Sequence, residues 1–383
     1  MASTTVESRS VVIVQSYVPS YRRPLFEQLR ARLGASGVVL TLVTSKPSRQ
    51  QRERRDEVRL DFQSVVRGVS VTVRGRTVRW KAVWRKTRGA DLVVCELASG
   101  VLENYSLSVW HKGRLATWGH GYATTTRPHW LDRALERWLM RHSKVFFAYT
   151  ERGRHQAREN GLSDSRIVVL LNTIDTTGLR AAINKVARGQ AREVPAAWDI
   201  GPDDMVCAFV GALDRSKRLD FLLDAGEAIW SEMPSFRLLI GGDGPDRDTV
   251  LRAASERPFV RYLGRVGDLE KAEIANVARV MLNPGRVGLV AVDSFVMGSP
   301  IVTTEWPLHA PEFDYLIPDE NALITGDSVE EYARAVRDLL KDPDRLSGLV
   351  AGCKAAADEL TMESLVGRFA DGILRALEEE PDG

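Results

Sequence analysis

Short apolar runs alternate with longer amphipathic stretches along the whole chain. In the first half, apolar runs of strand length lie at residues 11–15, 38–44, 92–95, 115–118 and 144–149. In the second half, they lie at residues 206–210, 236–240, 260–263, 280–283, 301–304 and 322–324. Strands that alternate with helical segments are typical of parallel sheets built from βαβ units. The pattern therefore predicts two similar α/β halves.

The amphipathic stretches between these runs have helical spacing. Residues 24–33 place Leu25, Phe26, Leu29 and Leu33 on one helical face, and a glycine follows. Residues 130–140 and 362–377 show the same periodicity. We therefore expect these three segments to be helices that each bury one face.

The length of 383 residues favours two domains over one hydrophobic core. We predict an N-terminal domain over residues 1–172 and a C-terminal domain over residues 173–361. Residues 362–383 are expected to form a helix and a tail that pack back toward the N-terminal domain. The polar segment 183–204 is the predicted loose connection, with a hinge near Asn172.

The composition is that of a soluble globular enzyme, with 44% hydrophobic and 27% charged residues. Three widely separated cysteines give no pair with metal or redox spacing, so we expect a reducing, cytoplasmic location. No apolar run approaches the roughly 18 residues that span a bilayer. If the protein meets a membrane, we expect contact from the inner face only.

Positive charge is concentrated in one stretch. Residues 46–88 contain fourteen Lys or Arg and four acidic residues, a net charge of +10, so the rest of the chain carries −8. Such a stretch can attract the phosphates of lipid head groups or of a lipid-linked acceptor, or it can be a solvated arginine-rich surface. Nucleic acid is not expected as a partner, because no nucleic-acid-binding motif accompanies the charge.

Three junctions between a strand and the following segment carry candidate binding residues. Residues 210–220 follow an apolar run and contain Gly211, Arg215 and Lys217. The free backbone N–H groups of a helix start favour an anion, and the two cations add full charges. A diphosphate fits this combination, although a charged first turn of a surface helix has the same sequence.

The second junction is the glycine turn Gly242-Asp243-Gly244, which comes directly after the run at 236–240. Consecutive glycines let a ligand approach the main chain. Pro245 follows, and the third glycine of a dinucleotide-binding fingerprint is absent, which argues against a dehydrogenase.

The third junction, residues 283–295, joins a strand to a helix through small and constrained residues. The N–H groups near Gly288, Leu289 and Val290 can bind a phosphate at the helix start. Asp293 lies one turn into the helix and could bind hydroxyl groups, although a solvated aspartate would look the same.

These segments together resemble the C-terminal domain of family-4 retaining glycosyltransferases, which have the GT-B fold. The resemblance rests on GALDRSKRLDFLLDA, LLIGGDGP, VRYLGRV and PGRVGLVAVDSFVMGSPIVTTEWPLHAPEFDYL, in that order, and covers roughly residues 90–330. It implies an α/β protein with two Rossmann-like domains facing across a cleft. It also implies a nucleotide diphosphate sugar as donor.

The resemblance assigns roles to individual residues of the C-terminal half. Lys217 matches the lysine that contacts the donor diphosphate, while Arg265 and Val266 follow the strand that borders the base. Asp293 stands where the second glutamate of the family's E-x7-E motif would bind the ribose, and Leu289 and Val290 face the diphosphate through their N–H groups.

The chain departs from the family pattern at the first glutamate of E-x7-E, where Gly285 stands. The form PGxVGL looks like a subfamily with a shortened loop, and Glu312 is one candidate for the missing sugar contact. The arginine of the family's GRL is replaced by Ala212, so Arg215 is a candidate for the missing charge.

In the N-terminal half, the segment that starts at Tyr17 resembles the first-strand loop of members that act on surface polysaccharides. Tyr17, Tyr21 and Arg22 are therefore assigned to the acceptor side. His120 lies between two glycines after a predicted strand, and the resemblance implies a histidine near the transferred sugar. A purely structural histidine is the alternative.

The resemblance thus implies a glycosyltransferase that acts on a glycan, lipid-linked or small-molecule acceptor with retention of anomeric configuration. No cofactor is expected, and transfer without a metal is predicted because no DxD motif stands in a suitable loop. Two alternatives stay open: a non-hydrolysing nucleotide-sugar epimerase, and a nucleotide- or glycan-binding protein that has lost catalysis.

Overall fold

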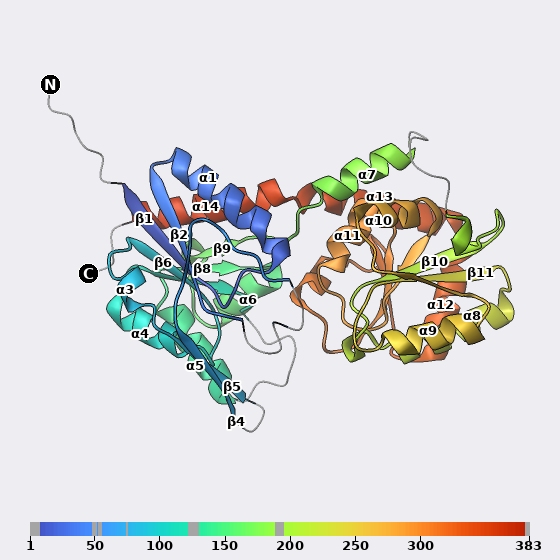
Figure 1. The fold of residues 1–383 in the computed structure, drawn as a ribbon, viewed down its shortest axis with the longest axis horizontal. Coiled ribbons are helices and arrows are strands. Elements are labelled where there is room, and N and C mark those ends of the chain that lie inside the picture. Colours follow the sequence, from blue (N-terminus) through green and yellow to red (C-terminus); the bar gives the residue numbers. More distant parts are fainter. Residues whose placement is uncertain are drawn as a thin grey trace. The chain divides into compact units, whose positions relative to one another are not determined.

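A computed structural model describes residues 8–47, 52, 56–73, 76–121, 130–187 and 195–379. The chain divides into two compact units (Figure 1). Unit 1 comprises Met1–Asp175 and Met362–Gly383, and unit 2 comprises Thr176–Thr361. The boundary between the units falls after residue 175, three residues beyond the predicted boundary after residue 172. The last four residues of the predicted tail lie outside the described residues.

Unit 1 contains a seven-stranded parallel sheet in the order β3-β2-β1-β6-β7-β8-β9, as well as a separate antiparallel hairpin, β4–β5. Its strands are β1 (Arg9–Val14), β2 (Val38–Thr44), β3 (Gln63–Val65), β4 (Gly68–Val73), β5 (Arg76–Lys81), β6 (Leu92–Glu96), β7 (Leu115–Gly119), β8 (Val145–Ala148) and β9 (Ile167–Val169). Its helices are α1 (Arg23–Ala35), α3 (Trp84–Thr87), α4 (Leu102–Trp110), α5 (Trp130–Arg141), α6 (Glu151–Glu159) and α14 (Met362–Glu378).

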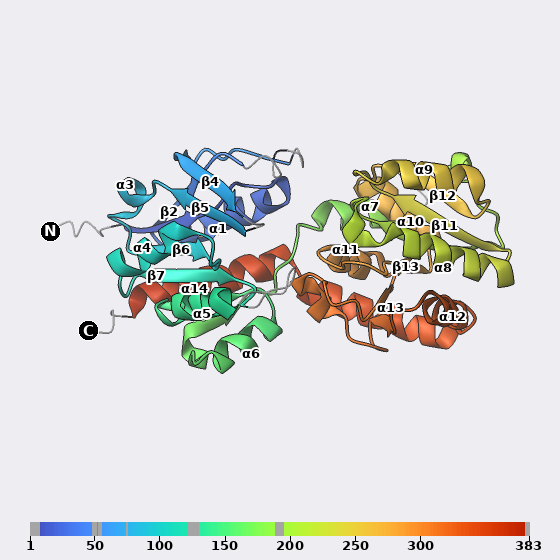
Figure 2. The same ribbon diagram turned by 90° about the horizontal axis from the view of Figure 1, so that it is seen from below.

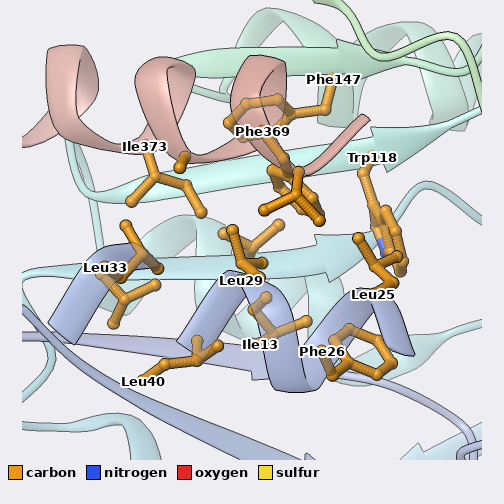
Figure 3. Close-up of a cluster of buried hydrophobic side chains, with 14 of the residues drawn as sticks. Ile13, Leu25, Phe26, Leu29, Leu33, Leu40, Trp118, Phe147, Phe369 and Ile373 are labelled. Carbon is orange, nitrogen blue, oxygen red and sulfur yellow. The ribbon is translucent and has the colours of Figure 1, made fainter. Parts of the chain in front are cut away.

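The core of unit 1 has two layers because side chains of a buried strand alternate between the two faces of the sheet. Val11 and Ile13 of β1 pack with α1 and α14, whereas Val12 and Val14 pack on the opposite face with Leu107 of α4. Helices α1 and α14 lie side by side on the first face (Figure 3). The last helix of the chain therefore completes the core of the first unit.

Unit 2 contains a six-stranded parallel sheet in the order β12-β11-β10-β13-β14-β15. Its strands are β10 (Met205–Val210), β11 (Phe236–Gly241), β12 (Val260–Gly264), β13 (Val280–Leu282), β14 (Ile301–Thr304) and β15 (Ala322–Thr325). Its helices are α7 (Thr177–Ala187), α8 (Leu219–Glu232), α9 (Arg247–Glu256), α10 (Asp268–Val277), α11 (Val290–Met297), α12 (Val329–Leu340) and α13 (Pro343–Glu359). The prediction of two α/β halves with parallel sheets is confirmed.

Two expectations need correction. Residues 183–187 belong to α7, which packs against α10 and buries Leu179 and Ala182, so the predicted loose connection is too long at its start. Residues 188–194 of that connection lie outside the described residues. The sequence analysis also did not identify the β4–β5 hairpin, in which valines alternate with Ser70 and Thr72 in β4, and Val78 and Trp80 flank Arg79 in β5. No helix among the described residues is long and apolar enough to cross a membrane.

Candidate functional site

The strand order of unit 2 reverses at β10. Strands β11 and β12 lie on one side of β10, and β13, β14 and β15 lie on the other. In open parallel sheets, ligands bind at the carboxyl ends of the strands where the order reverses, because the flanking loops diverge there. The loops after β10 and β13, which contain Lys217 and Leu289, are therefore the expected ligand-binding loops.

Protein backbone occupies the space beside the two glycines of the second junction, Gly242 and Gly244. A Cβ atom at Gly242 would overlap the carbonyl oxygen of Gly211, and one at Gly244 would overlap that of Leu213. The two loops are also joined by a hydrogen bond of 3.0 Å from the Leu213 N–H to the Asp243 carbonyl. The glycines thus serve close packing between neighbouring loops, whereas the sequence analysis assigned that space to a ligand.

Lys217 joins the loop after β10 to the loop after β13. Its ammonium group donates a hydrogen bond to the carbonyl oxygen of Arg286, and the Arg286 N–H donates to the Ser216 carbonyl at 2.8 Å. The pKa of Lys217 is lowered to about 8, first by burial and then by the charge of Arg286, while Asp214 opposes the shift. An anion placed here would stabilise the protonated lysine.

Two arginines flank Lys217 and differ in their surroundings. Arg215 is exposed and forms no ion pair with any residue that the structure describes. Arg218 has a left-handed backbone with φ 55°, pairs with Asp327 and lies 4.4 Å from the ring centre of Phe221. The predicted helix therefore begins only after Arg218, at the start of α8, and Arg215 is the arginine available to a ligand.

Helix α11 begins where the third junction predicted a phosphate-binding start. None of the described residues accepts a hydrogen bond from the backbone N–H of Leu289 or Val290. Such N–H groups in a first turn carry the positive end of the helix dipole. Together with Gly288, they offer donors to an anion.

His309 fixes the loop in front of α11. Its Nδ1 accepts a hydrogen bond of 3.1 Å from the Val287 N–H, so its Nε2 donates to the Thr304 carbonyl at 2.9 Å. The ring stacks on Phe313 with 4.0 Å between centroids. Burial, helped by nearby cations, lowers the pKa of His309 to about 4, so the ring is neutral and holds one tautomer.

Asp293 is engaged within the protein. Its carboxylate is buried and lies 2.7 Å from the ammonium group of Lys271 on α10. Burial raises the pKa of Asp293, although Lys271 counteracts the rise. The predicted contact with a ribose would require this ion pair to rearrange or to share an oxygen, so that role stays a prediction.

The remaining predicted donor residues lie around the same loops. Arg265 is exposed and pairs with Asp243 at 2.8 Å, and Val266 packs against Gly241. Glu312 is buried, and its Oε2 would lie 3.8 Å from a methyl group placed on Gly288. A carboxylate therefore stands close to the loop where the family's first glutamate is missing.

In unit 1, Arg22 is held at the carboxyl ends of three strands. It donates hydrogen bonds to Gln15 at 3.0 Å and to the Tyr149 hydroxyl at 2.7 Å, and it lies 4.7 Å from the ring centre of Trp118. Burial raises the pKa of Tyr149 to about 12. The arrangement fixes a cation at the end of β1, β7 and β8.

His120 follows β7 and lies edge-on to Tyr149, with 4.7 Å between ring centroids. It is therefore next to the Arg22 cluster, and its contact with a transferred sugar stays a prediction. Tyr21 is 39% exposed, whereas Tyr17 is buried with its hydroxyl 3.4 Å from Asp56. Tyr17 is thus placed to support the loop rather than to contact an acceptor.

The structure adds polar residues that the sequence analysis did not single out. Ser16 donates to the carboxylate of Glu96 at 3.0 Å and accepts from Arg79 at 2.8 Å. Glu96 ends an apolar strand, a signal that could have marked it. Arg79 comes from the unpredicted hairpin, so its position could not be inferred from sequence spacing.

Comparison with known proteins gives consistent results. Residues 204–342 match the family described as "Glycosyl transferases group 1". The chain is 28% identical to a 2-deoxystreptamine glucosyltransferase of Streptomyces kanamyceticus over 69% of this chain and 68% of that protein. It is 25% identical to a D-inositol 3-phosphate glycosyltransferase of Rhodococcus opacus over 59% of this chain and about half, 51%, of that protein.

Among solved structures, the Anabaena protein HepE in complex with UDP is similar, with a TM-score of 0.65 and 13% identity. The similarity covers 96% of this chain and 100% of that chain. At this identity the likeness shows the fold, and it confirms the GT-B class that the resemblance implied. Assignment to family 4 and to a PGxVGL subfamily stays a prediction. The chain is therefore a glycosyltransferase of the GT-B fold, and its residues 204–342 match the group 1 glycosyl transferases.

Proposed function

We propose that the protein transfers a sugar from a nucleoside diphosphate sugar to an acceptor, and that the loops after β10 and β13 hold the donor diphosphate. One observation carries the proposal: Lys217 is hydrogen-bonded to Arg286, four residues before the start of α11, whose first N–H groups lack acceptors among the described residues. The cation Lys217 is thus joined by a hydrogen bond to the loop that leads into the N-terminus of α11. Both favour a diphosphate.

The same groups would stabilise the leaving nucleoside diphosphate. Negative charge grows on the diphosphate as the glycosidic bond breaks, and fixed donors in a partly dry site stabilise that charge without reorganising. Lys217 and Arg215 supply full charges, and Leu289 and Val290 supply N–H groups. We therefore propose that these residues take the role that a bound metal ion plays elsewhere, so that transfer proceeds without one.

For the sugar and acceptor side, we propose the Arg22 cluster and His120 of unit 1. Tyr149 and Trp118 are buried and hold the guanidinium group of the half-buried Arg22 in place. Arg22 and His120 are therefore the groups that we assign to sugar hydroxyls. The acceptor class stays a glycan, a lipid-linked glycan or a small molecule. Retention of anomeric configuration is part of the proposal, and Glu312 is the candidate for the missing sugar contact.

Binding of nucleoside diphosphates tests the donor site. UDP, GDP, TDP and ADP are each added to the protein, and a ligand that binds only the folded state raises the melting temperature. Lys217→Ala should abolish the shift, whereas Lys354→Ala, an exposed lysine of α13 in the same unit, should leave it intact. An undiminished shift in Lys217→Ala would show that the diphosphate binds elsewhere.

Two further measurements test the chemistry. With the donor that binds and a panel of acceptors, the anomeric configuration of the product is read by NMR, and an inverted product refutes retention. Activity is then compared with and without a chelator such as EDTA. A loss of activity that is restored by a divalent cation would contradict the metal-independent mechanism.

A further inference from the structure

The β4–β5 hairpin of unit 1 exposes its apolar face. The strand register pairs Val69 with Trp80 and Val71 with Val78, which places these four side chains on one face. They are 60%, 48%, 52% and 39% exposed, respectively. The opposite face carries Lys81, which is buried, and Arg79, which is half-buried, as well as the exposed Ser70, Thr72 and Thr77. At the end that carries Arg79 and Lys81, the hairpin therefore has the reverse of the usual orientation, in which apolar side chains point inward.

Helix α4, which packs against β5, shows the same reversal. Leu102, Val109 and Trp110 are 47%, 68% and 52% exposed, whereas Glu103 and Asn104 are buried. The ring of Trp110 packs against Trp84 of α3 with 4.5 Å between centroids, and Trp84 is itself exposed. We call these exposed residues of β4–β5, α3 and α4 the inverted surface; the elements that carry them are labelled in Figures 1 and 2.

Buried polar contacts lock the inverted surface in this orientation. The ammonium group of Lys81 lies 3.0 Å from the carboxylate of Glu103 and donates to the Gln15 carbonyl at 3.2 Å. Arg79 donates to Ser16 from the same face of β5. Turning the hairpin or the helix over would break these contacts and leave buried charges unpaired, so the outward apolar face is a fixed property of unit 1.

The segments that carry the exposed apolar residues also carry exposed cations. Six exposed Lys or Arg residues lie on the same segments: Arg67, Arg85, Lys86, Arg88, Lys112 and Arg114. Within the described residues 67–73, 77–89 and 102–114, no exposed acidic residue accompanies them. Two copies of this surface would repel each other, which disfavours a homodimer interface. A partner must offer an apolar layer and negative charge together.

We propose that the inverted surface docks on a bilayer that contains anionic lipids. Tryptophans favour the boundary between head groups and acyl chains, and lysines and arginines bind anionic head groups. A bilayer supplies both layers at once, whereas protein interfaces are depleted in lysine. The inference goes beyond the donor proposal and does not depend on it, because the donor loops belong to unit 2.

Co-sedimentation with vesicles tests the docking surface. Wild-type protein is expected to bind vesicles of phosphatidylglycerol and phosphatidylcholine in equal parts, and not vesicles of phosphatidylcholine alone. Arg85→Gln with Lys86→Gln should weaken binding roughly 30-fold, because each cation near an anionic surface contributes about a factor of five. Trp84→Ser with Trp110→Ser should weaken it at least about tenfold through the lost apolar contact.

Matched changes in unit 2 provide the controls. Arg252→Gln with Lys354→Gln removes the same charge from exposed positions, and Leu269→Ser removes a side chain that is 47% exposed. Both should bind vesicles like the wild type. The thermal shift with UDP is recorded for every variant, so that a failure of the donor proposal is seen separately.

Three results would overturn the docking proposal: no binding to anionic vesicles, equal weakening in the unit 2 controls, or a dimer in solution that Trp84→Ser with Trp110→Ser dissolves. If the tryptophan variant does not fold, as judged by its melting curve, the glutamine variant decides alone, because its two side chains are exposed and form no ion pair with described residues.

Discussion

Replacing Lys217 by methionine should stabilise unit 2 and weaken nucleotide binding at the same time. The pKa of Lys217 falls from 10.5 to about 8, chiefly through burial. A shift of this size corresponds to about 3 kcal/mol. Because the side chain is only half-buried, we reduce the free-energy penalty for burying the ammonium group to about 2 kcal/mol. Methionine removes this penalty, but it also removes the hydrogen bond to Arg286, which costs about 1 kcal/mol. The net gain at neutral pH is about 1 kcal/mol, or about 2–4 °C in melting temperature.

The sign of the pH dependence follows from the same shift. Between about pH 8 and pH 10.5, the unfolded chain keeps the proton on Lys217 and the folded chain has lost it, so wild-type stability rises with pH. The methionine variant lacks this rise, and its advantage vanishes above pH 10.5. A bound diphosphate favours the ammonium form, so nucleotide affinity of the wild type should fall as pH rises through about 8.

Differential scanning calorimetry across this pH range measures the first effect, and titration calorimetry with UDP measures the second. Lys354→Met, at an exposed position of α13, is the control and should change neither. A Lys217→Met variant that is less stable at neutral pH, keeps the pH-dependent rise, or binds UDP like the wild type would refute the reasoning.

Three other predictions concern the loops and the inverted surface. The pKa of His309 is about 4 in the folded protein and 6.5 in the unfolded chain, so the unfolded chain binds the proton first and the free energy of unfolding should fall as pH drops from 6.5 toward 4. His309→Gln can keep both hydrogen bonds but does not titrate, so denaturant titrations of this variant should show a smaller fall. Gly242→Ala should destabilise unit 2 by more than about 3 kcal/mol and abolish nucleotide binding, because its Cβ would overlap the Gly211 carbonyl. The control Gly348→Ala, in open space on α13, should stabilise unit 2 by about 0.5–1 kcal/mol. Equal changes in the free energy of unfolding for the two variants would contradict the packing of these loops. Lys81→Met should cost about 3–5 kcal/mol, and adding Glu103→Leu should recover much of that in a double-mutant cycle, since the single change leaves an unpaired buried charge.

Much of the fold could be predicted because its signals are local. Apolar runs of strand length and helical periodicity depend only on neighbouring residues, and they located most strands of both parallel sheets. The β4–β5 hairpin was not identified, although valines alternate with Ser70 and Thr72 in β4, and that its apolar side chains point to solvent could not be read from the sequence.

The candidate site was predicted in part. The order of the strand-to-helix junctions in the second half identified the loops that contain Lys217 and Leu289, because a glycine-rich turn before a helix is visible in the sequence. The sequence did not show which partner each side chain contacts or how far it is buried. Asp293 is paired with Lys271, twenty-two residues away, and the space beside Gly242 is filled by the carbonyl of Gly211.

The sequence by itself determined most of the strands and helices and identified the loops that are candidates for anion binding. The tertiary structure decided which cations remain available, which glycines serve packing, and which apolar residues face outward. The physical reason is that hydrophobic periodicity and helix-start chemistry act over a few residues, whereas burial, ion pairing and pKa depend on segments that only the folded chain brings together.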